Sequence, residues 1–305
     1  MLNQIDEYSK ERNLTRNNIQ QHPSLLSTHP SQTDRRETTL SDLVGLGTKG
    51  EGPKTVPLST KKHSCLTTNL QSIDPSPVDP NTYYLQSTPH YLLRFFCTPK
   101  GEDKQSGRPG LKVATIADSS SDLNSILDAV EVAKKEGADI FVGPEWSFME
   151  IHPDPYSPRE TRQILEKLRA ASKGSKMLIV PGTLMVYTAS GRLYNLLPIF
   201  GDGKLMYSYI KRTDGGSKDY NLQRYKLQFG KKSGVFTYGG LKFGVEVCRD
   251  AFACGLYERG VRNLDVQILS SAGNSYTTAA INDSGITICV DGKCSRVTNA
   301  NIKQT

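Results

Sequence analysis

The chain has 305 residues, of which 36% are hydrophobic and 23% charged, and its formal net charge is +7. This hydrophobic fraction is low for one compact domain of that length, so part of the chain is expected to lie outside a core. Lysine and arginine form no long run interleaved with aromatic residues, and no stretch reaches the ~18 apolar residues of a membrane span. Neither a nucleic acid nor a membrane is therefore expected as a partner.

Cysteine is scarce, with six residues in the whole chain. This number implies no dense disulfide framework and favours a reducing compartment. The N-terminal stretch MLNQIDEYSKERNLTRNN is polar and lacks the apolar region of a secretory signal. The sequence therefore predicts a cytoplasmic protein.

Residues 1–110 are predicted to form a largely irregular N-terminal extension. Up to about residue 85 they are rich in Ser, Thr, Asn, Gln and Pro and show no sustained periodicity, so they cannot bury enough apolar surface to offset the entropy of ordering. Two exceptions are a short helix at 40–46 and a strand at 90–98 that docks on the domain. Residues 99–110 are expected to be a linker.

From residue 111 the pattern becomes that of an alternating α/β domain, predicted to span 111–305. LKVATIA is a buried strand, and the segment 119–137 contains an amphipathic helix that starts at a Ser/Asp cap and ends before Gly137. A second helix opens at Ser157–Pro158 with Glu160 and closes at Gly174. The remaining elements are strands at 139–143, 176–180, 183–187 and 265–270, hairpins around 201–204 and over 235–247, and a helix at 251–260.

Three chemically useful side chains follow apolar strands of this domain. Glu145 comes after strand 139–143, Lys211 after strand 205–210 and Cys248 after strand 241–247. Strand ends are where α/β folds place their sites. A carboxylate can take a thiol proton, a thiolate can attack a carbonyl or nitrile carbon, and an ammonium can stabilise the resulting negative charge. The three residues are therefore candidate catalytic groups.

The segments FVGPEWSF, YSYIKRT and GVEVCRDAF, in this order, resemble the nitrilase (carbon–nitrogen hydrolase) superfamily. The resemblance covers roughly 111–271, and it implies that 285–297 is a shortened hairpin version of the family's ending. It implies an αββα sandwich and a Glu–Lys–Cys triad at Glu145, Lys211 and Cys248. It further implies hydrolysis of amides or nitriles through a thioester or thioimidate without a metal, and pairing into homodimers.

We therefore expect a thiol-dependent hydrolase that acts on a small-molecule amide, with a nitrile as the less favoured substrate and with no cofactor. Trp146, Arg249 and Asn274 are the candidate substrate-binding residues. Arg249 and Asp250 are expected to form a local ion pair, which leaves the Arg249 N–H as a candidate oxyanion donor.

Other interpretations of the same residues stay open. A lone Cys at a strand end is usually a packed core residue. Zinc binding is disfavoured, because the spacings of Cys248–Cys254 and Cys289–Cys294 fit no ordinary zinc pair, and a Cys–His protease is disfavoured because His152 is the only histidine after residue 110. Residues 213–240 contain no glutamate where many amidases of the family have one, so the alternative is a catalytically impaired module that binds a metabolite or partner. In a further alternative, the N-terminal region carries the function as an interaction segment.

Overall fold

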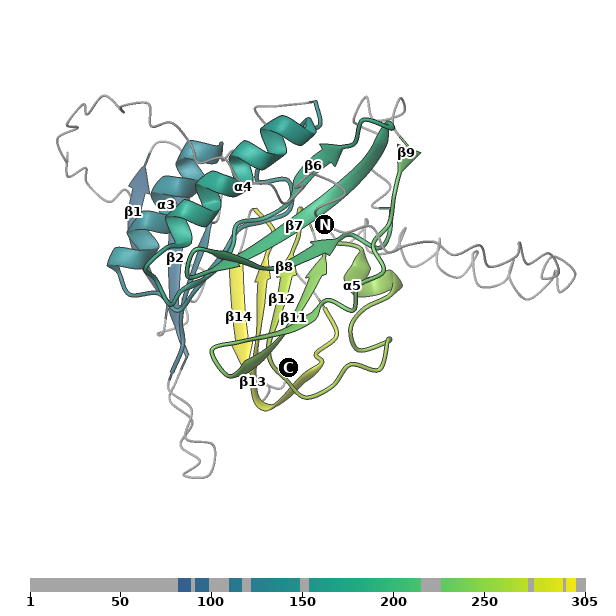
Figure 1. Ribbon diagram of the computed structural model, residues 1–305. Coiled ribbons are helices and arrows are strands. Elements are labelled where there is room, and N and C mark those ends of the chain that lie inside the picture. Colours follow the sequence, from purple (N-terminus) through teal and green to yellow (C-terminus); the bar gives the residue numbers. More distant parts are fainter. Residues whose placement is uncertain are drawn as a thin grey trace, which may run out of the picture. The chain divides into compact units, whose positions relative to one another are not determined.

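The computed structural model describes residues 82–88, 91–98, 110–116, 122–148, 154–214, 226–273, 277–292 and 295–299. These residues form two β-sheets with helices beside them (Figure 1). Among them, no helix is long and apolar enough to cross a membrane. The short helix predicted at 40–46 lies outside the described residues.

The larger sheet has the order β1-β2-β3-β4-β5-β7-β6, and β8 and β9 also pair with β7. Its strands are β1 (Thr82–Thr88), β2 (Tyr91–Cys97), β3 (Lys112–Ile116), β4 (Ile140–Val142), β5 (Leu178–Val180), β6 (Leu184–Tyr187), β7 (Arg192–Gly201), β8 (Lys204–Ile210) and β9 (Lys226–Leu227). β3, β4 and β5 run parallel, which places the carboxyl ends of these strands at one edge. The predicted strand at 90–98 is confirmed, since β2 pairs with β3. The sheet therefore contains strands from both sides of the boundary predicted between residues 110 and 111.

The smaller sheet has the order β10-β11-β12-β13-β14. Its strands are β10 (Val235–Tyr238), β11 (Leu241–Val247), β12 (Leu264–Ser270), β13 (Ile281–Val290) and β14 (Ser295–Asn299). β11, β12 and β13 are parallel, while β10 and β14 form antiparallel hairpins at the two edges. The hairpins predicted over 235–247 and 285–297 are confirmed.

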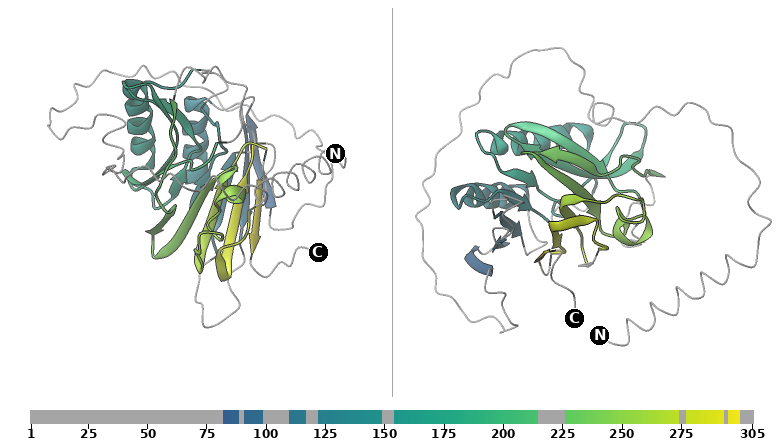
Figure 2. Two further views of the ribbon diagram at one scale, coloured as in Figure 1. Left: turned by 90° about the vertical axis from the view of Figure 1, so that its right-hand side faces the viewer. Right: turned by 90° about the horizontal axis from the view of Figure 1, so that it is seen from below.

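Two amphipathic helices, α3 (Leu123–Lys135) and α4 (Pro158–Ser172), cover one face of the larger sheet (Figures 1 and 2). Both begin where the sequence predicts. Asp122 caps α3 by accepting a hydrogen bond from the Ser125 N–H at 2.7 Å, and Ser157 and Glu160 form a capping box at the start of α4. These caps satisfy N–H groups that the first helical turn leaves without partners.

Alternate residues of the short central strands face two different cores. In β4, Phe141 packs toward the helices, whereas Ile140 and Val142 pack toward the smaller sheet. Ile179 of β5 faces the helices in the same way. The centre of the larger sheet is therefore buried on both faces, which explains why β4 and β5 are continuous apolar runs in the sequence.

On the outer face of the smaller sheet lies α5 (Asp250–Ala253), whose Ala251 packs on Leu269 and Cys289. The arrangement of helices and two packed sheets is the α/β nitrilase-like sandwich that the sequence predicts. The helix predicted over 251–260 is confirmed only over 251–253 and is wrong beyond them, because Cys254 leaves the helical conformation with φ −159° and ψ 46° and ends α5 after four residues. Turns follow as far as β12, and the Arg259 side chain donates to the Cys254 carbonyl oxygen at 2.8 Å.

Candidate active site

Glu145 lies in the turn after β4, and two close backbone approaches shape this turn. A Cβ on Gly143 would lie 2.4 Å from the Pro181 carbonyl oxygen. Gly182 has a φ of +97°, and a Cβ there would lie 2.2 Å from the Pro144 carbonyl oxygen. The turns after β4 and β5 can pack this closely only because both positions are glycine. This packing fixes Glu145 at the strand end, where only 1% of the residue is exposed.

Backbone contacts between the two sheets bring the Glu145 turn to the end of β12. The Glu145 N–H donates to the Ser271 carbonyl oxygen at 3.1 Å, and the Ser270 hydroxyl donates to the Gly143 carbonyl oxygen at 3.0 Å. The Cys248 N–H donates to the Ser270 carbonyl oxygen at 3.0 Å. The backbones of Glu145 and Cys248 are thus hydrogen-bonded to neighbouring residues at the end of β12.

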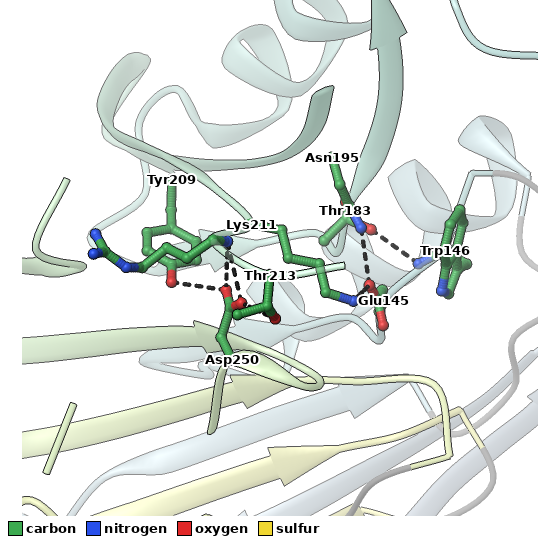
Figure 3. A network of polar contacts seen from close by, with 9 residues as sticks. Glu145, Trp146, Thr183, Asn195, Tyr209, Lys211, Thr213 and Asp250 are labelled. Carbon is green, nitrogen blue, oxygen red and sulfur yellow. Dashed lines mark hydrogen bonds and ion pairs between the residues drawn. The ribbon is translucent and has the colours of Figure 1, made fainter. Parts of the chain in front are cut away.

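Lys211, directly after β8, forms a buried ion pair with Glu145. Its Nζ lies 2.7 Å from Oε1 of the carboxylate, and the two side chains are only 6% and 1% exposed (Figure 3). Burial alone would lower the pKa of Lys211, but the charges of Glu145 and Cys248 outweigh burial and hold this pKa above its usual value. The ammonium therefore stays charged in the interior.

Asn195, on β7, is a member of this site that the sequence analysis missed. Its Nδ2 donates to the same Oε1 atom of Glu145 at 2.8 Å, and its carbonyl oxygen accepts from the Lys211 N–H at 2.9 Å. Oε2 of Glu145 receives no hydrogen bond from the described residues, and in Figure 3 it points away from both donors. The only available signal was one amide side chain inside the buried run LYNLLPIF.

Cys248 occupies a tight turn between β11 and α5. Its φ is +47°, a left-handed conformation that is costly for a residue with a Cβ, and the side chain is partly exposed. Burial raises the pKa of the thiol, and the Glu145 charge raises it further, while Lys211 and hydrogen bonds involving Ser271 and Ala272 act in the opposite direction. The resting group is therefore a thiol, which needs a base before it can attack.

Asp250 is fully buried at the start of α5 and contacts the end of β8. It accepts hydrogen bonds from the Tyr209 hydroxyl at 2.8 Å, the Thr213 hydroxyl at 2.7 Å and the Arg212 N–H at 3.0 Å (Figure 3). The predicted ion pair with Arg249 is wrong, because these three donors occupy the carboxylate and the Arg249 side chain is exposed.

The candidate substrate-binding residues fall in different places. Trp146 is half-buried, its N–H donates to the Thr183 hydroxyl at 3.0 Å, and its indole packs with Met185 and Leu193. This packing gives Trp146 a structural role beside Glu145. Asn274 lies outside the described residues.

In the described ranges, no group of three or more His, Cys, Asp or Glu side chains is arranged to hold a metal ion. The cysteines in the described part of the chain, Cys97, Cys248, Cys254 and Cys289, form no disulfide. The groups gathered at the strand ends are thus a carboxylate, an ammonium, an amide and a thiol, which suit proton transfer and nucleophilic attack.

Comparison with known proteins identifies the same region. Residues 109–271 match the model of the carbon-nitrogen hydrolase family. Two curated relatives are glutamine-dependent NAD(+) synthetases, from Acinetobacter baylyi (25% identical over 139 residues, 45% of this chain) and Thermotoga maritima (24% over 141 residues, also 45%). The chain spans only 26% and 24% of the length of these relatives.

One of the matching solved structures shows the same fold. A mutant of the amidase from Nesterenkonia sp. AN1, with the acetamide moiety of fluoroacetamide on its active-site cysteine, matches with a TM-score of 0.50 and 15% identity over 62% of this chain and 82% of that one. A branch 10 member of the nitrilase superfamily from Saccharomyces cerevisiae is 25% identical over 54% of this chain and 65% of its own, with a TM-score of 0.42.

Proposed function

The chain belongs to the carbon–nitrogen hydrolase family, and we propose that it hydrolyses the amide bond of a small molecule with Cys248 as the nucleophile. The observation that carries this proposal is the buried Glu145–Lys211 ion pair, which lies against the strand end that also holds the Cys248 turn. Burying two charges is energetically costly unless they compensate each other or take part in a reaction.

In the proposed first step, Oε2 of Glu145 takes the proton of the Cys248 thiol while the sulfur attacks the carbonyl carbon. Oε2 suits this role because Lys211 and Asn195 both donate to Oε1. The raised pKa of Cys248 is consistent with such a base. Proton transfer neutralises Glu145 as the thiolate forms, so the two groups never carry negative charge together.

The carbonyl oxygen becomes an oxyanion when the sulfur adds. Lys211 has three N–H donors and uses one on Glu145, which leaves donors for the oxyanion, together with the backbone N–H of Arg249. Glu145 then passes its proton to the leaving nitrogen, and ammonia or an amine departs from a thioester. Glu145 next deprotonates a water molecule that attacks the thioester, which releases the acid and restores the thiol.

The primary amide of glutamine is the first substrate to assay, because two relatives are named as glutamine-dependent enzymes. The experiment measures ammonia release from glutamine and a panel of small primary amides, with wild type and Cys248→Ala. We expect turnover of at least one amide, a loss of about 10³-fold or more in the variant, and an acyl adduct on the Cys248 peptide by mass spectrometry. Full turnover by Cys248→Ala would disprove the nucleophile.

A second candidate is a catalytically impaired module that binds a metabolite or partner. It is favoured by the absence of glutamate in residues 213–240. The described glutamine of that interval, Gln228, follows β9 and donates from its backbone N–H to the Leu193 carbonyl oxygen at 2.8 Å. This candidate predicts that no amide in the panel is hydrolysed and that a thiol electrophile fails to label Cys248 stoichiometrically near neutral pH.

A further inference from the structure

Asp250 is a buried carboxylate that has no role in the proposed reaction steps. It is fully buried, and its oxygens accept from three residues of one short stretch, Tyr209, Arg212 and Thr213. A buried carboxylate is retained only when hydrogen bonds replace its hydration. Here all the replacing donors come from the residues around Lys211.

The position of Asp250 in the chain connects two parts of the site. It stands two residues after Cys248, whose carbonyl oxygen accepts from the Ala251 N–H at 3.1 Å. Its side chain reaches from the smaller sheet to the end of β8 in the larger one. In Figure 3 the Lys211 side chain runs from this contact toward Glu145, so the anchored backbone is the origin from which the ammonium extends.

We propose that Asp250 is a positioning residue that fixes the end of β8 and thereby holds the Lys211 ammonium between Glu145 and the Cys248 thiol. This inference rests on the proposed function of the same site. Asp250 touches no reacting atom and acts through Lys211. Its negative charge also helps to hold the pKa of Lys211 up against burial, after the larger effects of Glu145 and Cys248.

The chain offers a matched control in Glu246. This carboxylate is also fully buried and also accepts three hydrogen bonds, from the Leu256 N–H, the Gln267 amide at 2.9 Å and the Thr277 hydroxyl at 2.7 Å. None of these partners belongs to the Glu145–Lys211 pair. Replacing Glu246 by Gln therefore tests what the loss of any buried carboxylate on this side of the molecule does.

The experiment compares wild type, Asp250→Asn and Glu246→Gln in the full chain. Cys248 is alkylated with iodoacetamide from pH 6 to 10, and the modified peptide is quantified by mass spectrometry. The Lys211 ammonium lowers the pKa of the Cys248 thiol. If Asp250→Asn displaces this ammonium, the curve of labelling rate against pH should move to higher pH by about one pH unit. Labelling at neutral pH should then be about tenfold slower than in wild type. With an amide that wild type hydrolyses, kcat should fall and KM should change little, since the oxyanion forms only in the reaction.

Glu246→Gln should leave both the labelling profile and kcat in place, whatever it does to the melting temperature. The inference is overturned if Asp250→Asn labels and turns over like wild type, or if both variants shift alike, which would mark a purely structural role. If Asp250→Asn does not fold, Thr213→Val removes one donor, keeps the carboxylate and should give the same shift at smaller size. Wild type that is not labelled at Cys248 would overturn the proposed function, and the inference with it.

Discussion

Replacing Lys211 by Met should destabilise the protein strongly, because it removes one member of a buried ion pair. The change keeps a long side chain but deletes the charge 2.7 Å from Oε1 of Glu145, and that carboxylate, 1% exposed, would retain only the Asn195 hydrogen bond. Removing one partner of a buried pair typically costs about 3–5 kcal/mol. At about 2–4 °C per kcal/mol for a domain of this size, the melting temperature should fall by between about 6 and 20 °C.

The assay is thermal unfolding followed by circular dichroism for Lys211→Met, Glu145→Gln and the double variant. The double variant should be more stable than the sum of the single losses predicts, with a coupling of about 1–3 kcal/mol, because it leaves no uncompensated charge. Arg169→Met is the control. Its ion pair with Glu166 has side chains that are 53% and 52% exposed, so its loss should cost about 1 kcal/mol or less.

Two results would refute this reasoning. One is a melting temperature of Lys211→Met within about 2 °C of wild type, which would mean that the pair contributes no more than a surface pair. The other is strict additivity of the two single changes, which would mean that Lys211 does not compensate the charge of Glu145.

Three further predictions concern pH, thiol reactivity and backbone conformation. Burial, followed by the charge of its carboxylate partner Asp250, raises the pKa of Tyr209 well above 10. The protonated hydroxyl therefore contributes stability that is complete below the pKa of the unfolded state and is lost as pH rises past that value. Melting temperatures between pH 9 and 11 should fall more steeply for wild type than for Tyr209→Phe, and equal slopes would contradict the assignment. In Glu145→Gln, iodoacetamide should label Cys248 faster at neutral pH than in wild type, because the Glu145 charge raises the pKa of the thiol. Amide turnover should nevertheless be lost. Slower labelling would argue against this electrostatic effect. Gly182→Ala should lower the free energy of unfolding by more than about 2 kcal/mol in urea titrations. Gly174→Ala is the control and should cost about 1 kcal/mol, because Gly174 is also at positive φ but no atom lies within 4 Å of an added Cβ. Similar losses for the two variants would show that the structure relieves the crowding at Gly182.

Local patterns in the sequence predicted most of the fold. The starts of α3 and α4 followed from cap residues, and the strands followed from apolar runs because burial on both faces leaves no polar alternation. The same reasoning failed over 254–260, where Leu256 packs on Leu264 and Ala280 from a turn rather than from a helix. Spacing alone could not separate these two outcomes.

In the candidate site, too, the sequence predicted some residues and missed others. Glu145, Lys211 and Cys248 were visible because each ends an apolar strand, and Glu145 and Lys211 do form an ion pair. Asn195 and Asp250 were missed or assigned the wrong partner, because their contacts cross 50 and 41 residues of chain and depend on how the sheets dock. The catalytic roles, the homodimer, the cytoplasmic location and the irregular character of residues 1–110 stay predictions.

In the described part of the chain, each sheet is built from one continuous region, with the strands of the larger sheet before residue 228 and the strands of the smaller one after residue 234. This division gives the site an order of assembly during synthesis, which proceeds from the N-terminus. Glu145 and Lys211 are synthesised before Cys248. The thiol then arrives last, and contacts as distant as the 127 residues between Gly143 and Ser270 make its docking a late folding step. A nascent chain therefore carries the base and the ammonium before it carries the group that they are proposed to activate.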